Sequence, residues 1–244
     1  AREGKTSRHN GTMDANHRQQ GWGEAVVDIL VEFFEAAVHS LLHARRVYPQ
    51  DIFERRRKYG VPVWMSRHPE LNNYIYEVLL RAKTLMERGV VRKVLVCFFR
   101  DAAEHGGQAP VERVAFDVRV EEDGDGSVNL LNLQEVEDQL RSALLQIHKS
   151  SAHLPTRQGC TFALHVEAHE KEGEGQARRH DASQDGRGSS AVRSALRGGK
   201  WLLADSDAQA VLADPGRRQL VPFKSVRGRG LALDISAEMG DCPT

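Results

Sequence analysis

The most strongly patterned stretch of the chain is Glu24–Arg45, in which most positions are apolar. Its polar side chains fall at helical spacing: Asp28, Glu32, Glu35, His39 and His43. On a helix this spacing gathers them into one narrow stripe and leaves apolar side chains around nearly all of the remaining circumference. We therefore expect a central helix that is packed on several sides, with the stripe as its only face in contact with water.

A second helix is indicated from residue 69. Pro69 suits the first helical position, Glu70 favours the positive N-terminal end, and Gly89 suits the position just past the last turn. The apolar positions between them recur three or four residues apart: Leu71, Tyr74, Ile75, Val78, Leu79, Ala82, Leu85 and Met86. This spacing predicts a helix with one face on the core.

Three further segments have the composition or the alternation of β-strands. Residues 90–99 are rich in β-branched and aromatic side chains, whereas 114–120 and 162–166 alternate between apolar and other positions. The alternation predicts an antiparallel sheet with one face toward water. A third helix is expected from Asn132, which with Glu135 forms a variant of the capping box. Three helices on an antiparallel sheet define an α+β architecture.

Several segments lack regular periodicity. Residues 1–22 are polar and are interpreted as a disordered tail. Pro49 ends the first helical pattern, and a connector is expected from there to about Arg67. Residues 168–200 contain almost no large apolar side chain, which indicates a flexible insertion.

The end of the chain is sparse in regular structure. After residue 200 the apolar segments are short, although 231–235 alternates like a strand. We expect one domain over 23–236 and a tail at 237–244. Because the periodic segments all lie before Glu167, we also expect a core that folds without the C-terminal region.

The composition is ordinary for a globular chain of 244 residues, with 40% apolar and 28% charged positions. No apolar run approaches the roughly 20 residues of a membrane-spanning helix, and the polar N-terminus lacks the apolar segment of a signal peptide. The formal net charge of zero gives no overall attraction to nucleic acid, so DNA contact requires a local patch or a partner. Cys97, Cys160 and Cys242 form no CxxC pair, which favours a reducing compartment over a disulfide framework.

Candidate chemistry is scarce. Glu35, His39 and His43 have a spacing compatible with zinc, but HExxH is absent and the polar stripe already explains them. The turn at 123–126 lacks the glycine and glutamate that a calcium loop needs further on, and Cys160 with a distant histidine is not a specific nucleophile pair. No GxSxG, GxGxxG or phosphate-binding loop occurs between a strand and a helix. We predict no enzyme activity, no cofactor and no metal.

A basic run, Arg55 to Lys58, is the one candidate for direct contact with nucleic acid. Such a run could bind a phosphate backbone or serve as a nuclear import signal. Charges in a connector are more often simply solvent-exposed, and that interpretation is favoured here.

A string of short motifs in fixed order adds a different kind of information. The motifs are EAVVDILVEFFEAAVHSLL at 24–42, VYP at 47–49, IF at 52–53, KY at 58–59, VPV at 61–63, MS at 65–66, HPELN at 68–72, GCTF at 159–162, Trp201 with LAD at 203–205, and DP at 214–215. Together they span about residues 23 to 236. The chain in this region closely resembles the HORMA-domain accessory subunit of DNA polymerase zeta, the mitotic-arrest-deficient-like family.

The resemblance implies a HORMA fold and a non-catalytic adaptor. In this family a C-terminal "safety belt", here 201–236, closes over an extended, proline-containing peptide of a partner and adds it to the sheet as a strand. The matching positions for peptide binding are Tyr48, Tyr74, Trp201 and Leu203. The implied partner is the catalytic subunit of DNA polymerase zeta, in translesion synthesis and DNA repair.

Other family surfaces carry over to single positions. Arg141 matches a surface for dimers with another HORMA protein or a second copy. Leu220 matches an interface for the deoxycytidyl transferase scaffold of translesion synthesis, while Asp234 or a neighbour stands where the family offers a tyrosine. The resemblance implies a nuclear protein that meets DNA only through partners and binds no membrane. A checkpoint-type HORMA protein that regulates mitosis or meiosis is the alternative.

Overall fold

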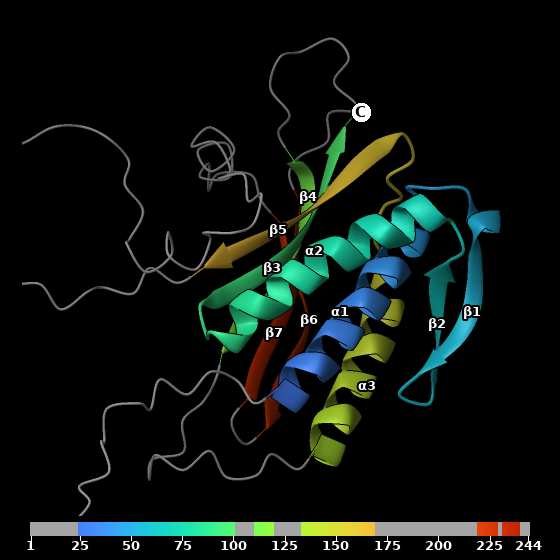
Figure 1. Ribbon diagram of the computed structural model, residues 1–244. Helices are drawn as coiled ribbons and strands as arrows, with labels where there is room; N and C mark the ends of the chain where they lie inside the picture. The colour runs from blue at the N-terminus through green and yellow to red at the C-terminus, as the bar shows by residue number, and fades with distance from the viewer. Residues whose placement is uncertain (1–23, 101–109, 120–132, 169–218, 229–230, 240–244) are drawn as a thin grey trace, which may run out of the picture.

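The computed structural model describes residues 24–100, 110–119, 133–168, 219–228 and 231–239 (Figure 1). The N-terminal tail, the insertion beyond Ala168 and the first part of the expected belt, 201–218, lie outside these ranges. The described elements are α1 (Glu24–Arg45), a 3-10 turn (Gln50–Ile52), β1 (Phe53–Lys58), β2 (Val61–Ser66), α2 (Pro69–Glu87), β3 (Val91–Arg100), β4 (Pro110–Arg119), α3 (Leu133–Ser151), β5 (Cys160–Ala168), β6 (Gln219–Gly228) and β7 (Leu231–Met239).

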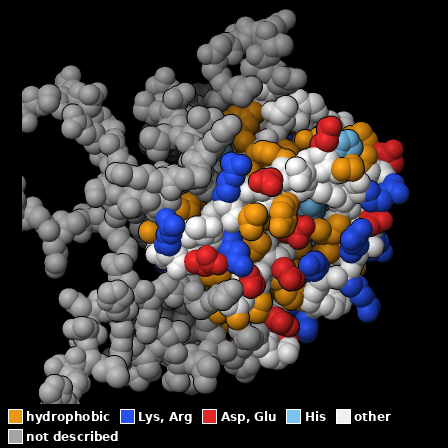
Figure 2. Space-filling view, viewed as in Figure 1, with side chains coloured by type: hydrophobic (Ala, Val, Ile, Leu, Met, Phe, Trp, Pro, Cys, Tyr) orange, Lys and Arg blue, Asp and Glu red, His pale blue; other side chains and the backbone are white. Residues whose placement is uncertain are grey.

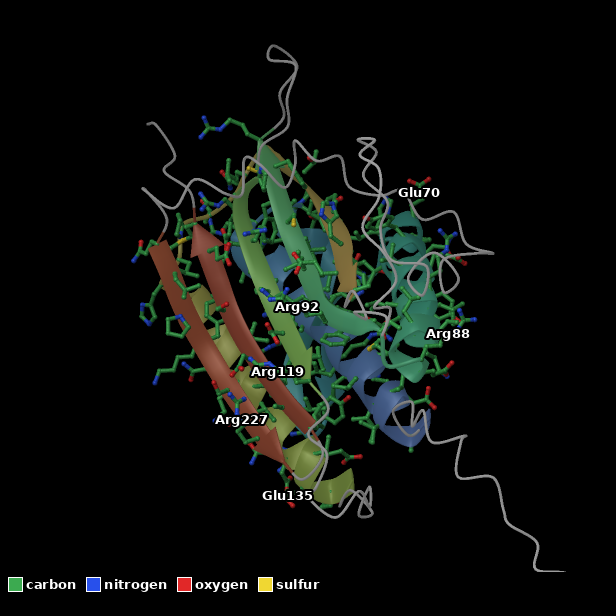
Figure 3. All side chains as sticks on the ribbon, turned by 90° about the vertical axis from the view of Figure 1, so that its left-hand side faces the viewer. Glu70, Arg88, Arg92, Arg119, Glu135 and Arg227 are labelled. Atoms are coloured by element: carbon green, nitrogen blue, oxygen red, sulfur yellow. The ribbon has the colours of Figure 1, made fainter. Side chains whose placement is uncertain are left out.

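Five strands form one antiparallel sheet in the order β5-β3-β4-β7-β6. The three helices lie on one face of this sheet (Figure 1), and Figure 3 shows the strands in front with α1 and α3 behind them. The α+β architecture expected from the sequence is confirmed. Among the described residues, none of the helices has the length and apolarity that crossing a bilayer requires.

Helix α1 lies at the centre of the packing, as its apolar circumference predicts. It contacts α2, α3 and β2, and its side chains also reach the sheet. Phe33 and Phe34 meet Phe116 of β4 edge-on, with ring centroids 6.0 Å and 5.5 Å away. All three rings are fully buried, and such edge-to-face contacts stabilise a core beyond the burial of their area.

The expected connector between α1 and α2 contains a β-hairpin instead. β1 and β2 pair in register from Phe53↔Ser66 to Lys58↔Val61, and the turn residues Tyr59 and Gly60 both have positive φ, at 48° and 74°. Two-residue hairpin loops favour this backbone conformation, which is uncommon for a tyrosine. Tyr59 is held there by tertiary contacts, because its hydroxyl donates to the Ile29 carbonyl at 2.8 Å.

The hairpin corrects the expected role of the polar stripe on α1. β2 covers the C-terminal half of the stripe, so that His39 is only 1% exposed and accepts a 3.4 Å hydrogen bond from the Ser66 amide at Nδ1. His43 stacks on Trp64 with ring centroids 4.0 Å apart. Asp28 and Glu32 are exposed to water, whereas Glu35 and His43 are partly buried.

The C-terminal strands belong to the core. β7 lies inside the sheet, between β4 and β6, and its inward side chains Leu231, Leu233, Ile235 and Ala237 are buried. The structure therefore argues against a core that is complete before Glu167, because removing β7 would expose this row and one side of β4. β7 also runs to Met239, so the expected boundary after residue 236 falls within a strand.

A buried ionic cluster joins three parts of the chain. Glu112 of β4 accepts hydrogen bonds from Arg45 Nε at 2.7 Å and from Arg157 Nε at 2.8 Å, one on each carboxylate oxygen. Arg45, at the end of α1, also donates to the Ser151 carbonyl at the end of α3. Since these charges are almost fully removed from water, each depends on its partners.

We expect Glu112→Ala to lower the free energy of unfolding by about 3–5 kcal/mol, because it leaves two buried guanidinium groups without their carboxylate. Glu54→Ala is the matched control: it removes the carboxylate of the exposed pair with Arg56 and should cost less than about 1 kcal/mol. Urea denaturation of the three proteins measures both values. Similar, small losses in the two variants would contradict a structural role for the buried cluster.

A second expectation concerns pH. Burial, with a smaller contribution from the Arg56 charge, lowers the pKa of His39 to about 4. The unfolded imidazole has a pKa of about 6.5, so as the pH falls from there the unfolded state takes up the proton first. The free energy of unfolding should then decline between about pH 6.5 and about pH 4, and less steeply in a His39→Gln protein. The urea midpoints of the two proteins, measured across that pH window, test this expectation. An equal loss of stability in both proteins would contradict it.

Candidate functional site

The outer edge of strand β5 pairs with no other strand in the part of the chain that the structure describes. β5 is the terminal strand of the sheet and pairs only with β3 among the described residues. The Leu164 amide donates to the Tyr74 hydroxyl at 3.2 Å and so points away from β3. Because bonding alternates along an antiparallel pair, the main-chain groups of Phe162 and Val166 also point to the outer edge. Such an edge is a template for another extended segment.

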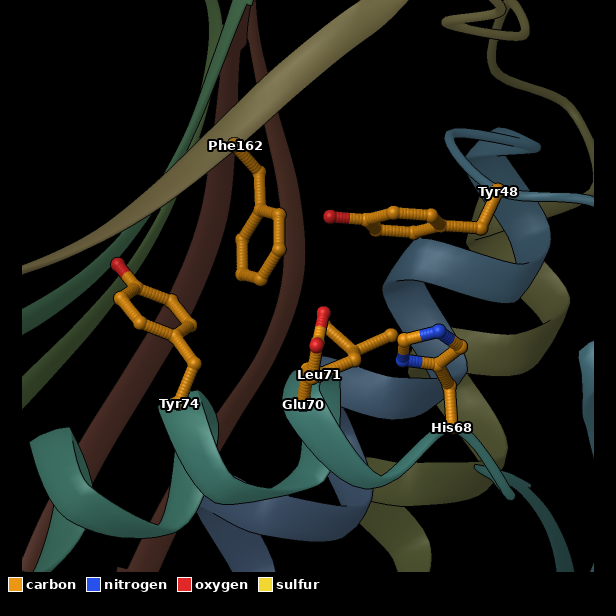
Figure 4. Close-up of a pocket in the computed structure, with 6 residues that line it drawn as sticks. All are labelled: Tyr48, His68, Glu70, Leu71, Tyr74 and Phe162. Atoms are coloured by element: carbon orange, nitrogen blue, oxygen red, sulfur yellow. The ribbon is translucent and has the colours of Figure 1, made fainter.

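A pocket of about 340 Å³ lies beside this edge (Figure 4). Three parts of the chain supply its walls: the segment that follows α1, the start of α2 with the residue before it, and β5. The residues that line it are Tyr48, His68, Glu70, Leu71, Tyr74 and Phe162. Pro69 at the first position of α2 sets the start of that helix and thereby places four of these side chains within two turns.

Three aromatic rings give the pocket its shape. Phe162 stands between the two tyrosines and meets each edge-on, with centroid distances of 6.1 Å to Tyr48 and 5.5 Å to Tyr74. Tyr74 is 39% exposed, so the ring is open to a ligand as well as packed. Burial, and then the neighbouring Tyr74, raise the pKa of Tyr48, whose hydroxyl therefore remains a hydrogen-bond donor. Aromatic walls beside main-chain groups that face away from the sheet suit an extended peptide.

Within the part of the chain that the structure describes, no group of three or more His, Cys, Asp or Glu side chains could hold a metal ion. One thiol–imidazole contact escaped the sequence analysis: Cys97 Sγ lies 3.8 Å from His165 Nδ1. Burial raises the pKa of Cys97 to about 12 and lowers the pKa of His165. Both groups are neutral near pH 7, so this cysteine is not an activated nucleophile.

The structure brings together two of the four residues predicted for peptide binding. Tyr48 and Tyr74 line one pocket although they come from different elements, whereas Trp201 and Leu203 lie outside the described residues. Phe162 and His68 were missed as site residues. Their motifs, GCTF and HPELN, were recognised, but nothing in one sequence shows that β5 and the start of α2 meet.

Two other predicted positions lie on separate surfaces. Arg141 of α3 donates from Nε to the Tyr59 carbonyl at 2.7 Å and pairs with Asp138. This arginine therefore supports the hairpin turn, and a role in dimers stays a prediction. Leu220 of β6, at the opposite end of the sheet from β5, is 62% exposed.

Asp234, which stands near the position of the family's tyrosine, is committed to contacts within the sheet. Its carboxylate accepts hydrogen bonds from Ser225 at 2.6 Å and Arg227 at 2.8 Å, and Arg119 of β4 pairs with it at 2.8 Å. Burial alone would raise the pKa of Asp234, but these hydrogen bonds and charges lower it. Asp234 thus cross-links β4, β7 and β6.

The basic run lies on β1, where its side chains are exposed or partly exposed (Figure 2). Arg56 pairs with Glu54 and Lys58 with Glu32, while the Arg55 guanidinium lies over the Trp64 ring at 5.5 Å from its centroid. These contacts support the interpretation of the run as a solvent-exposed surface.

Comparison with known proteins places this geometry in a family. The model of the HORMA domain family matches residues 27–171. The chain is 35% identical to the "Mitotic spindle assembly checkpoint protein MAD2B" of Gallus gallus over 89% of its own length and 92% of that protein, and the Homo sapiens protein of the same name gives the same figures. The chain belongs to the HORMA domain family, and the resemblance found in its motifs is confirmed.

Other relatives and solved structures extend the comparison. The "DNA polymerase zeta processivity subunit" of Schizosaccharomyces pombe is 44% identical over 30% of this chain and 35% of that protein. A chain in the "Crystal Structure of Mitotic Checkpoint Complex" has a TM-score of 0.62 at 21% identity and covers 89% of this chain and 99% of its own length. The structure titled "Structure of C. elegans HTP-2 bound to HIM-3 closure motif" has a TM-score of 0.56 at 12% identity, with 88% and 90% covered. At these identities the two structures show the fold alone.

Proposed function

We propose that this chain is a non-catalytic adaptor that captures an extended, proline-containing peptide of a partner along the open edge of β5. The observation that carries the proposal is the outer edge of β5, which pairs with no strand among the described residues and has an aromatic pocket directly beside it. Main-chain hydrogen bonds supply affinity in such a complex, and side-chain pockets select the sequence. A HORMA protein of similar fold has been solved with a bound closure motif, which supports peptide capture.

The proposed partner is the catalytic subunit of translesion DNA polymerase zeta, with this chain as its accessory subunit in DNA damage tolerance and repair. Relatives from Schizosaccharomyces pombe, Arabidopsis thaliana and Drosophila melanogaster carry names that assign them to this polymerase. The safety belt would add Trp201 and Leu203 to the walls formed by Tyr48 and Tyr74. The protein would act in the nucleus and meet DNA through the polymerase.

Two further surfaces complete the proposal. Leu220 on β6 is exposed and would bind a second partner, which in this family is the deoxycytidyl transferase scaffold. Asp234 stands near the position of the family's tyrosine and is paired with Arg119 and Arg227, so this second interface would differ from that of the family. Arg141 would contribute to pairing with another HORMA protein or a second copy. The alternative, a regulator of mitotic or meiotic progression, is supported by the checkpoint name of the vertebrate relatives.

Affinity purification of the full chain from cells of its own organism, followed by mass spectrometry of the bound proteins, tests this proposal. We expect the polymerase zeta catalytic subunit among them. Recovery of only checkpoint or meiotic proteins would favour the alternative, and recovery of neither class would contradict the proposal.

The site is tested with Tyr74→Ala in the same experiment. Losing an aromatic anchor at a peptide site costs about 2 kcal/mol or more, roughly thirtyfold in affinity, so recovery of the partner should fall sharply. Tyr76→Ala is the matched control, because Tyr76 is 56% exposed on the same helix and does not line the pocket. Circular dichroism should show that both variants stay folded. Equal recovery of the partner with the two variants would show that Tyr74 does not contribute to binding.

A further inference from the structure

We infer that the Tyr74 hydroxyl guards the open edge of β5, and that an incoming strand must displace it from the Leu164 amide before it can pair there. This inference rests on the proposed function and adds a competing contact within the protein itself. Tyr74 then has two opposed roles, in which its ring attracts the peptide and its hydroxyl occupies the place of a peptide carbonyl.

The geometry of the edge supports the first part of this inference. Leu164 is a buried residue at the middle of β5, and its amide bonds to Tyr74 Oη at 3.2 Å. In Figure 4 the Tyr74 hydroxyl points from α2 toward β5. A buried amide without a partner is costly, so the hydroxyl stabilises the edge as long as no strand is bound.

Competition follows from the space available. A neighbouring strand in a sheet lies about 4.8 Å away and places its carbonyl oxygen about 2.9 Å from the amide nitrogen that donates to it. The Tyr74 hydroxyl already occupies that position in front of the Leu164 amide. An amide has one hydrogen, so a guest carbonyl and the tyrosine hydroxyl cannot both accept it with good geometry.

The displaced ring does not have to leave the site. Tyr74 meets Phe162 edge-on and is 39% exposed, so a small rotation can carry its hydroxyl off the edge while the ring still packs against the guest. Competition by the Tyr74 hydroxyl therefore favours the binding of segments that offer both a main-chain carbonyl opposite Leu164 and a side chain for the pocket. It also protects an exposed strand edge from indiscriminate pairing.

The first test uses the full chain without any peptide. Tyr74→Phe keeps the ring and removes the hydroxyl, while Tyr76→Phe makes the same change at an exposed position on α2. Hydrogen exchange of single amides, followed by NMR, should be about threefold to tenfold faster at Leu164 in Tyr74→Phe only. The amides of Ala163 and His165, which face β3, should not change. An unchanged exchange rate of the Leu164 amide in Tyr74→Phe would contradict the inference.

The second test measures binding of a synthetic peptide that copies a proline-containing segment of the same organism's polymerase zeta catalytic subunit. If the hydroxyl competes, Tyr74→Phe should bind this peptide about threefold to tenfold more tightly than the wild type. Tyr74→Ala, which also loses the ring, should bind the peptide more weakly than the wild type. Tyr76→Phe is the control and should bind it with the wild-type affinity. Weaker binding by Tyr74→Phe would overturn the guard but leave the proposed function standing. If no protein binds the peptide although Leu164 exchanges as expected, the proposed function fails and the guard of the free edge remains supported.

Discussion

Helix α1 has apolar side chains around nearly all of its circumference, and its neighbours are arranged so that each covers part of that surface. The sheet contacts it through Phe116, α2 and α3 pack along it, and the β1–β2 hairpin covers the buried end of its polar stripe. The buried cluster of Arg45, Glu112 and Arg157 then ties the end of α1 to the sheet. The positions of Tyr48, just after α1, and of the start of α2 both depend on this packing, so the pocket is a consequence of how α1 is buried.

The two edges of the sheet differ in a way that matters for function. β7 and β6 extend the sheet beyond β4, and ion pairs from Arg119 to Asp234 and from Arg113 to Glu238 fasten β7 to β4. At the other end, β5 is followed by no further strand in the described ranges. The proposed peptide and a protein bound at Leu220 would therefore occupy opposite ends of one sheet.

Much of the fold could be predicted from the sequence, because it depends on periodicity within single segments. The three helices and the strands β3, β4, β5 and β7 all carry the expected spacing of apolar residues. The β1–β2 hairpin could not be predicted in this way, because β1 carries the run Arg55 to Lys58 and its turn relies on Tyr59 in a left-handed conformation. His39 was misjudged for the same reason: a polar residue in a stripe is exposed unless a segment elsewhere in the chain covers it.

The site was predictable only through resemblance. Tyr74 fits the apolar spacing of α2, and that spacing alone would place it in the core; its exposure and its bond to Leu164 arise from the meeting of α2 with β5. Contacts of this kind join residues about ninety positions apart, and no local pattern encodes them. Motif similarity predicted Tyr48 and Tyr74 for peptide binding, whereas the place of Phe162 in the same pocket required the geometry.

The central claim is that β5 receives the partner peptide. Hydrogen-exchange mass spectrometry of the full chain, free and in complex with the partner it purifies with, tests this most directly. The account predicts new protection of main-chain amides within Cys160–Ala168, while exchange within β3 and β4 stays as it was. Protection confined to β6 and β7, with β5 exchanging as fast as in the free protein, would contradict it.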